Sequence, residues 1–195
     1  MLVNRNVAAY PALGKLLEHW AEIKQECMKL DTEDILPLDR TEKTHEQVAE
    51  AIREGGKQGW VRAWGPSRDL WLNYCFTIHG EPFLDDGRTP ITMGLLRRMR
   101  GVKVSALSLF RPGACLPAHG HEELGEEKLL TFHLCLDADD MRANCLWTEG
   151  ELLHEVPGNA FIFDGSKLHY AYNCSSADRL ILYMEFSPER LEWVA

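Results

Sequence analysis

The second half of the chain consists of short strand-like runs that alternate with turn residues. From Val102 onward these runs are rich in branched, aromatic and leucine side chains, and Gly, Pro, Asn and Asp separate them. Several short strands at such intervals are typical of an all-β sandwich or barrel. The predicted strands are 102–110, 129–136, 143–147, 160–163, 169–172 and 179–186, preceded by an earlier one at 69–78.

The first third of the chain has a helical pattern instead. Apolar residues between 10 and 30 recur at helical spacing, which predicts an amphipathic helix. A second helix is expected from Thr44, whose hydroxyl can cap the helix while Gln47 reaches back, to the glycine pair at 55–56. A short helix is expected at 91–99, and the segments 31–43 and 81–90 are expected to be loops.

The length fits one domain. The 195 residues, 45% of them hydrophobic, suffice for a sizeable core. No flexible linker separates the helical part of the sequence from the strand-rich part. We therefore predict a single catalytic domain over 1–195, with a helical layer over about 1–56 and a β-barrel core over about 60–195.

Charge and hydropathy exclude several classes of partner. Twenty-one Lys and Arg against 30 Asp and Glu give a net charge of −9 without a basic run, so we expect no nucleic-acid partner. No apolar stretch is long enough to span a bilayer, and no secretory signal is visible at the N-terminus. We expect a cytoplasmic protein with reduced thiols, no membrane partner and a small-molecule or peptide substrate; the oligomeric state is open.

The histidines carry the chemical information. His119 and His121 form an H-x-H pattern, and on an extended segment both imidazoles point the same way. A third histidine, His169, begins a later predicted strand. Histidines from two strands that converge in a barrel can form a mononuclear non-haem iron site, since neutral imidazole suits Fe(II). Zinc held by three histidines is an alternative, and so are histidines with a purely structural role.

An ordered set of motifs between residues 10 and 186 resembles the aspartyl/asparaginyl β-hydroxylases, a family of Fe(II)- and 2-oxoglutarate-dependent dioxygenases. The motifs are Tyr10-Pro-Ala-Leu-Gly-Lys, Ser108-Leu-Phe-Arg-Pro-Gly leading to His119, His133-Leu-Cys-Leu, Gly158 through Phe163-Asp164-Gly-Ser-Lys-Leu-His169, Asn173, and Arg179 ten residues after His169. The resemblance implies a mainly β fold, a double-stranded β-helix (a jelly-roll or cupin-like barrel), with the N-terminal helices packed on it.

The resemblance also implies roles for individual residues. His119 and His169 match the family's iron-binding, catalytic histidines. Arg179 matches the arginine that pairs with the distal carboxylate of 2-oxoglutarate, which suits its two-pronged donor set. Ser108 and His133 match further co-substrate contacts, and Trp71 aligns less closely with a tryptophan near the same pocket.

Two positions depart from the family pattern. His121 stands where the family often has glycine, so it is either a third iron ligand or a residue that points away. Thr131 stands where an arginine is common. Either Lys128 replaces that arginine or the co-substrate is held with one fewer cation.

Other polar groups have simpler interpretations. Asp137, Asp139 and Asp140 are expected to form a solvated turn, and the thiol of Cys115 is a minor candidate ligand. The basic cluster Arg97, Arg98, Arg100 and Lys103 is either a solvated helix end or a contact for an acidic substrate. With the loop at 81–90, the helix end at 97–100 is the predicted determinant of specificity, because loops at a barrel mouth usually set it.

The predicted activity is hydroxylation of an unactivated C–H bond in an Asp- or Asn-like substrate, either a free or derivatised amino acid or a peptide or protein residue. The resemblance implies Fe(II), 2-oxoglutarate and O₂, with release of succinate and CO₂. Two alternatives stay open. One is a cupin-like metal enzyme that does not use 2-oxoglutarate, since Gly113 followed by His119-Gly-His121 also fits a cupin motif. The other is a non-catalytic barrel that binds a small ligand.

Overall fold

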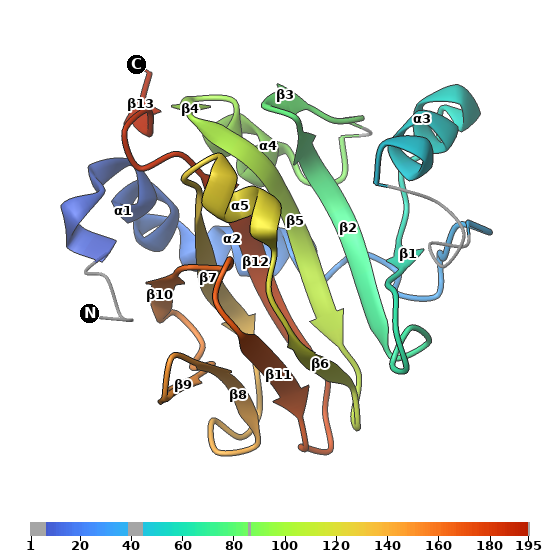
Figure 1. The fold of residues 1–195 in the computed structure, drawn as a ribbon. Coiled ribbons are helices and arrows are strands. Elements are labelled where there is room, and N and C mark those ends of the chain that lie inside the picture. Colours follow the sequence, from blue (N-terminus) through green and yellow to red (C-terminus); the bar gives the residue numbers. More distant parts are fainter. Residues whose placement is uncertain (1–6, 39–44, 86, 195) are drawn as a thin grey trace.

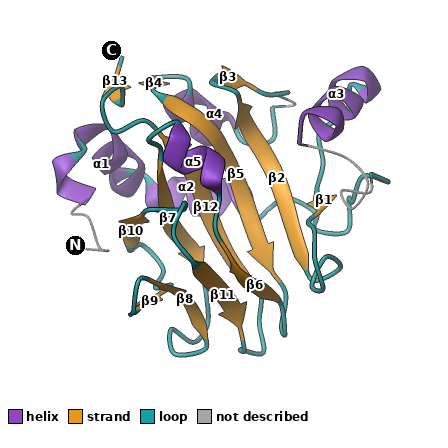
Figure 2. Ribbon diagram, in the orientation of Figure 1, coloured by secondary structure: helices purple, strands orange, loops and turns teal. Residues whose placement is uncertain are grey.

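Two antiparallel sheets face each other and form the centre of the molecule (Figures 1 and 2). This computed structural model describes residues 7–38, 45–85 and 87–194, and for residues 45 and 46 the backbone only. The larger sheet has the order β1-β2-β5-β12-β7-β10, with β3 also pairing with the end of β2, and the smaller one has the order β6-β11-β8-β9. Two further short strands, β13 and β4, pair with each other.

The strands of the larger sheet are β1 (Val61–Arg62), β2 (Trp71–Ile78), β3 (Glu81–Pro82), β5 (Val102–Phe110), β7 (Leu130–Asp137), β10 (Ala160–Phe163) and β12 (Arg179–Phe186). Those of the smaller sheet are β6 (Cys115–His119), β8 (Asn144–Thr148), β9 (Glu151–His154) and β11 (His169–Asn173), and the separate pair is β4 (Met99–Arg100) with β13 (Glu192–Trp193). The helices are η1 (Val7–Ala9), α1 (Pro11–Glu18), α2 (Trp20–Cys27), α3 (His45–Gly55), α4 (Pro90–Leu96) and α5 (Glu122–Glu126).

The two faces of the larger sheet have different roles. Leu72, Tyr74 and Phe76 alternate along β2 and are buried in one large apolar core with residues of α1, α2 and α4, so these helices cover the outer face. The residues between them, such as Trp71 and Asn73, point toward the smaller sheet and line an internal cavity. The predicted mainly β, double-stranded β-helix fold with N-terminal helices packed on it is confirmed.

The helix expected over 10–30 is two helices. The backbone of His19 leaves the helical region, with φ −110° and ψ 16°, and separates α1 from α2. Both helices bury apolar residues in the same core, among them Leu13 and Leu16 from α1 and Ile23 from α2. The start predicted at Thr44 for the next helix lies outside the described residues.

Other boundaries differ where distant segments pair. The helix expected over 91–99 ends at Leu96, because Met99 and Arg100 form β4 against Trp193 and Glu192 near the C-terminus. Strand β9 and helix α5 were not predicted. In the part of the chain that the structure describes, no helix has the length and apolarity needed to cross a membrane.

A buried carboxylate joins the helical layer together. Glu26 in α2 accepts hydrogen bonds from the backbone N–H groups of Ile91 and Thr92, at 2.7 and 2.9 Å, and from the Thr92 hydroxyl at 2.9 Å. These N–H groups belong to the first turn of α4 and have no partner within the helix. Glu26 is 8% exposed, so an unsatisfied group at this contact would be costly.

Replacing Glu26 with Ala should therefore lower the free energy of unfolding by about 2–3 kcal/mol, because bonds to a charged acceptor are lost and buried donors are left unpaired. Urea denaturation followed by circular dichroism measures the change. Glu22→Ala, on the exposed side of the same helix, is the matched control and should stay within about 0.5 kcal/mol of the parent. Equal stability of the two variants would contradict this assignment.

Candidate metal centre

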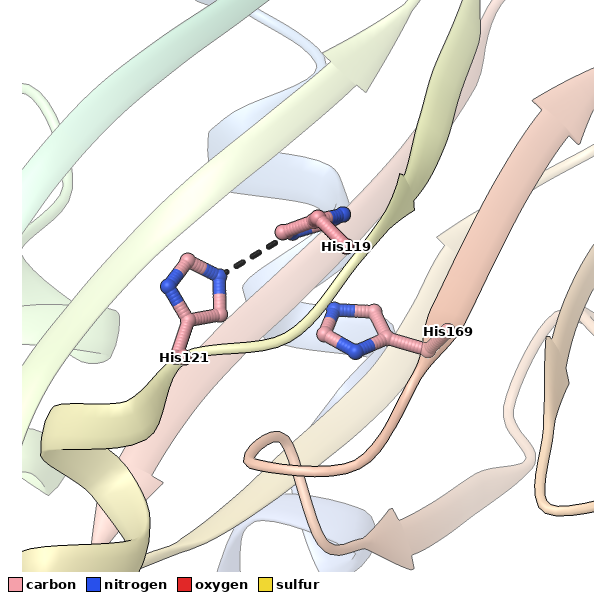
Figure 3. A group of neighbouring side chains, drawn as sticks. All are labelled: His119, His121 and His169. Carbon is pink, nitrogen blue, oxygen red and sulfur yellow. Dashed lines mark hydrogen bonds between the residues drawn. The ribbon is translucent and has the colours of Figure 1, made fainter.

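Three histidines converge where the smaller sheet meets α5. His119 ends β6 and His169 begins β11, and the two are register partners in the antiparallel ladder. His121 follows two residues later, as the residue before α5. One nitrogen from each ring lies within 4.8 Å of the others, and the Nε2 atoms of His119 and His121 are 3.1 Å apart (Figure 3).

The hydrogen bonds of the three rings leave the Nε2 atoms available. Nδ1 of His119 lies 2.8 Å from the Pro117 carbonyl, and Nδ1 of His169 lies 2.8 Å from the Lys167 carbonyl. Because a carbonyl can only accept, each Nδ1 carries the proton and each Nε2 carries a lone pair. In His121, Nδ1 lies 3.2 Å from the Glu123 carboxylate, which favours the same tautomer. Adjacent lone pairs repel each other, so this arrangement fits a bound cation.

Burial keeps two of these rings neutral. It lowers the pKa of His169 to about 4 and also lowers the pKa of His119, whereas the carbonyl contacts act in the opposite direction. At neutral pH both rings are therefore in the form that binds a metal. His121 is brought beside them by the turn at Gly120. A Cβ at Gly120 would lie 2.7 Å from the Ser166 carbonyl oxygen, so a larger residue would push this turn away from the loop before His169.

A cavity of about 300 Å³ connects the histidines with a buried arginine. Arg179 is 1% exposed, and its guanidinium carbon lies 3.9 Å from the centre of the Phe110 ring. The Nε and Nη1 atoms of Arg179 make no hydrogen bond to any described residue. Buried donors without partners are rare in proteins, so the guanidinium of Arg179 has donor capacity left for a further acceptor.

The other predicted co-substrate residues line the same cavity. Nε1 of Trp71 donates a hydrogen bond to Oγ of Ser108 at 2.9 Å, so the Ser108 hydroxyl hydrogen is free to donate in turn. His133 contacts the rings of Phe161 and Phe163 with centroids 5.2 Å apart in each case. The structure thus brings Trp71, Ser108, His133 and Arg179 to one wall of a cavity whose other wall carries the three histidines.

Glu155 is a residue of this region that the sequence analysis missed. It is 1% exposed, its Oε1 lies 2.9 Å from Nδ1 of His133 and 3.7 Å from Nη1 of Arg179, and its Oε2 has no partner among the described residues. It follows β9 in an irregular segment, without a motif around it, so only the three-dimensional arrangement reveals it. A carboxylate at this place compensates the buried charge of Arg179 and orients His133.

The structure shows where the residues that depart from the family pattern lie. Lys128 is exposed at the end of α5, so it does not replace the missing arginine. Thr131 is buried, and its hydroxyl oxygen has no partner among the described residues. The thiol of Cys115 contacts the Ser67 hydroxyl at 3.4 Å and is not part of the histidine group.

The predicted specificity segment lies elsewhere. None of the described residues of 81–90 or 97–100 lines the cavity, and α3 contributes Val48, Ala49 and Ile52 instead. Arg97 pairs with Asp85 at 2.8 Å and Arg100 pairs with Glu192 at 3.1 Å. The segments 81–90 and 97–100 therefore do not line the cavity, although Phe83 packs against the residues of α3 that do, and their part in specificity stays a prediction.

The acidic residues after β7 form no second metal site. Asp137 pairs with Lys24 at 2.7 Å, and Asp139 and Asp140 accept backbone hydrogen bonds in an exposed turn. The predicted solvated turn agrees with these contacts.

Comparison with known proteins bears on the chemistry of this centre. A family model described as aspartyl/asparaginyl β-hydroxylase matches residues 17–188. The chain belongs to this family. A curated relative, an ornithine lipid ester-linked acyl 2-hydroxylase from Rhizobium tropici, is 30% identical over 100 residues, which is 50% of this chain and 34% of that protein. The chain thus matches about a third of the length of the relative.

Similar solved structures come from the cupin superfamily. A sugar phosphate isomerase from Silicibacter pomeroyi is 17% identical, with a TM-score of 0.41 over 66% of this chain and 69% of that one. A predicted oxalate decarboxylase from Thermotoga maritima is 14% identical, with a TM-score of 0.40 over 60% and 80%. Likenesses of this order carry no statement about the activity of this chain. The family model and the hydroxylase relative are the findings that point to a hydroxylase.

Removal of one histidine should weaken metal binding. We expect His119→Ala, His121→Ala and His169→Ala each to reduce Co(II) affinity by at least about tenfold. Changing a residue that only orients a metal ligand already costs about this much, so removal of a ligand should cost at least as much. Visible absorption during anaerobic Co(II) titration measures it. His154→Ala, an exposed histidine on β9, is the control. If His121→Ala binds Co(II) as tightly as the parent, His121 is not a ligand and the site consists of His119 and His169.

Loss of the charge on Glu155 should destabilise the fold. Glu155→Gln keeps an acceptor for His133 but leaves Arg179 as a buried, uncompensated cation, so we expect a loss of about 3–5 kcal/mol in the free energy of unfolding. Glu151→Gln, exposed on β9, is the matched control for urea denaturation. If both variants unfold at the parental urea concentration, Glu155 does not compensate Arg179.

Proposed function

We propose that this protein is an Fe(II)- and 2-oxoglutarate-dependent dioxygenase that hydroxylates an unactivated C–H bond. The observation that supports it most is the buried guanidinium of Arg179, which lines the same cavity as the three histidines and has two donors without a partner among the described residues. The overall reaction is balanced as substrate C–H plus O₂ plus 2-oxoglutarate giving substrate C–OH plus succinate plus CO₂. Bound iron would supply the activation of O₂ in this reaction.

The residues of the chain have separate tasks in this proposal. His119 and His169, with His121 as the third member, hold the metal through their Nε2 atoms. Arg179 and the Ser108 hydroxyl bind the distal carboxylate of 2-oxoglutarate, and Trp71 orients Ser108.

His133, on the same wall of the cavity as Arg179, is a further co-substrate contact. Glu155 orients the His133 ring through Nδ1. Because Thr131 is uncharged and Lys128 is exposed, neither residue supplies the positive charge of the missing arginine. The co-substrate is therefore held with one fewer positive charge than the family pattern has. The rings of Trp64 and Phe163 contact His119 and His169, and Trp71 packs against Trp64; aromatic walls of this kind limit the access of water to a reactive site.

The substrate class is an Asp- or Asn-like compound, which is either a free or derivatised amino acid or a residue of a peptide or protein. The name of the Rhizobium relative adds an acyl-bearing compound as a second class, and the mostly apolar lining of the cavity favours that class. A cytoplasmic location, a single catalytic domain and the absence of nucleic-acid and membrane partners stay predictions. The rival function is a cupin-like metal enzyme without 2-oxoglutarate, which would not need Arg179.

Succinate formation tests the proposal directly. Protein reconstituted anaerobically with Fe(II) should form succinate when 2-oxoglutarate and air are added, and more of it with a panel of Asp-, Asn- and acyl-containing compounds. Mass spectrometry should find a +16 shift in the compound that stimulates turnover. No succinate under any of these conditions would overturn the proposal.

Arg179→Ala should weaken 2-oxoglutarate binding and leave iron binding intact. Truncating one partner of a buried charge pair costs about 2–5 kcal/mol, which is roughly 30-fold or more in the dissociation constant. Titration calorimetry measures the co-substrate constant, and Arg190→Ala, an exposed arginine, is the control. Because Arg179→Ala leaves Glu155 buried without its partner, Ser108→Ala is the milder second variant, with an expected loss of about fivefold from one hydrogen bond. An unchanged constant in both folded variants would favour the rival function.

A further inference from the structure

The cavity continues beyond the histidines, away from Arg179. Arg179 and Glu185 lie on the same face of β12 and six residues apart, which is about 20 Å along a strand. Both line the cavity, Arg179 beside Phe110 at one end of the ladder and Glu185 opposite Val104 toward the other. The proposed co-substrate site takes the Arg179 end, so the Glu185 end is free for another molecule. We call this end the far lobe and define it by Val48, Ala49, Ile52, Ile78, Val104 and Glu185.

Apolar side chains from three elements form the walls of the far lobe. Helix α3 contributes Val48, Ala49 and Ile52, and strands β2 and β5 contribute Ile78 and Val104. The three residues of α3 belong to a small apolar cluster that is separate from the main core (Figure 1 shows α3 beside the edge of the larger sheet at β1 and β2). Such walls stabilise an apolar group, since each buried CH₂ contributes about 0.8 kcal/mol.

Three polar residues, His79, Lys103 and Glu185, line the cavity beside these apolar walls. Glu185 accepts a hydrogen bond from the buried Tyr183 hydroxyl at 2.7 Å, which holds one of its oxygens in place. Its other oxygen has no hydrogen-bond partner among the described residues. Burial raises the pKa of Glu185, while Tyr183, His121 and Lys103 act in the opposite direction.

The other charged groups nearby already have partners. The ammonium group of Lys103 pairs with Glu127, and the Glu123 carboxylate contacts Nδ1 of His121. His79 also has an interaction partner, so Glu185 is the polar group that we take as the anchor for a ligand. A carboxylate acceptor in apolar surroundings selects a hydrogen-bond donor, and a positively charged one most strongly.

We propose that the far lobe is the substrate subsite and that it takes an amine-bearing compound whose apolar portion packs on α3 while its ammonium group binds Glu185. The inference rests on the proposed function and narrows its substrate class to amino-acid derivatives that keep a free amine and carry an apolar group. Since His121 and Glu185 line the same cavity and interact electrostatically, we expect the carbon closest to the anchored nitrogen to lie toward the metal centre.

Three probes of equal chain length test the inference on the full-length, metal-free protein. Decylamine, decanol and decanoate are titrated below their micelle concentrations, and the fluorescence of Trp64 and Trp71, which line the cavity, reports binding. Decylamine should bind about tenfold more tightly than the other two, the value of one charge-assisted hydrogen bond. Glu185→Gln should remove this preference and leave decanol affinity within about twofold, while Glu189→Gln, a nearby exposed glutamate, should behave as the parent.

A variant that fills the far lobe distinguishes binding of the probes in this lobe from non-specific binding elsewhere on the protein. Ala49→Leu places three more carbons in the space beside Ile52 and should weaken all three probes. Equal affinities of the three probes, a preference for decylamine that persists in Glu185→Gln, or probe binding unchanged by Ala49→Leu would each overturn the inference.

Succinate formation without substrate, measured on the same preparation with Fe(II) and 2-oxoglutarate, keeps the two proposals apart. Turnover together with equal probe affinities overturns only the subsite. Selective decylamine binding without any succinate overturns only the dioxygenase.

Discussion

The antiparallel register between β6 and β11 is the constraint on which the chemistry of this protein depends. It places His119 directly opposite His169, and the turn at Gly120 returns His121 to the same side. Each ring uses Nδ1 for an oxygen acceptor, so the lone pairs of the Nε2 atoms are directed at one another. A slip of one residue in this ladder would turn His169 to the other face of the sheet and separate the ligands.

The buried charge of Arg179 is the second element of the design. A guanidinium that is 1% exposed carries a large desolvation cost, and a single carboxylate at 3.7 Å with no hydrogen bond offsets only part of it. Glu155 shares its carboxylate with His133, which leaves Nε and Nη1 of Arg179 without acceptors. The folded protein therefore holds a buried cation with two unpaired donors at the end of its cavity, as the proposed binding of an anionic co-substrate requires. The conformational cost of ordering this group is met by the packing of Phe110 and the neighbouring strands rather than by the ligand.

The chemical character of the cavity changes along β12, from Arg179 at one end to Glu185 at the other. Its arginine end suits a dicarboxylate, its middle carries the histidines, and its far lobe combines apolar walls from α3 with the carboxylate of Glu185. The alternation of side chains along one strand places Arg179, Ile181, Tyr183 and Glu185 on the same inner face, so this strand runs along the cavity from the proposed co-substrate site to the far lobe. This order agrees with the hydroxylase family to which the chain belongs, and it gives α3 a part in the site that its distance in the sequence conceals.

Much of the architecture was predictable from the sequence because it depends on local patterns. Short apolar runs between turn residues predict the strands, helical spacing predicts a helical N-terminal layer, and the ordered motifs from Ser108 to Arg179 identify the family and the residues that line the cavity. Neither Glu155 nor Glu185 has a recognisable motif, because their importance comes from contacts with His133, Arg179 and Tyr183 made only after the strands pair. The division of the N-terminal helix at His19, the end of α4 before β4 and the position of α3 on the cavity likewise follow from packing between segments far apart in the chain. Local sequence specifies which residues favour a strand or can hold a metal, whereas the register and the layering of the sheets decide which of them share a cavity, since these depend on the summed burial of many distant side chains.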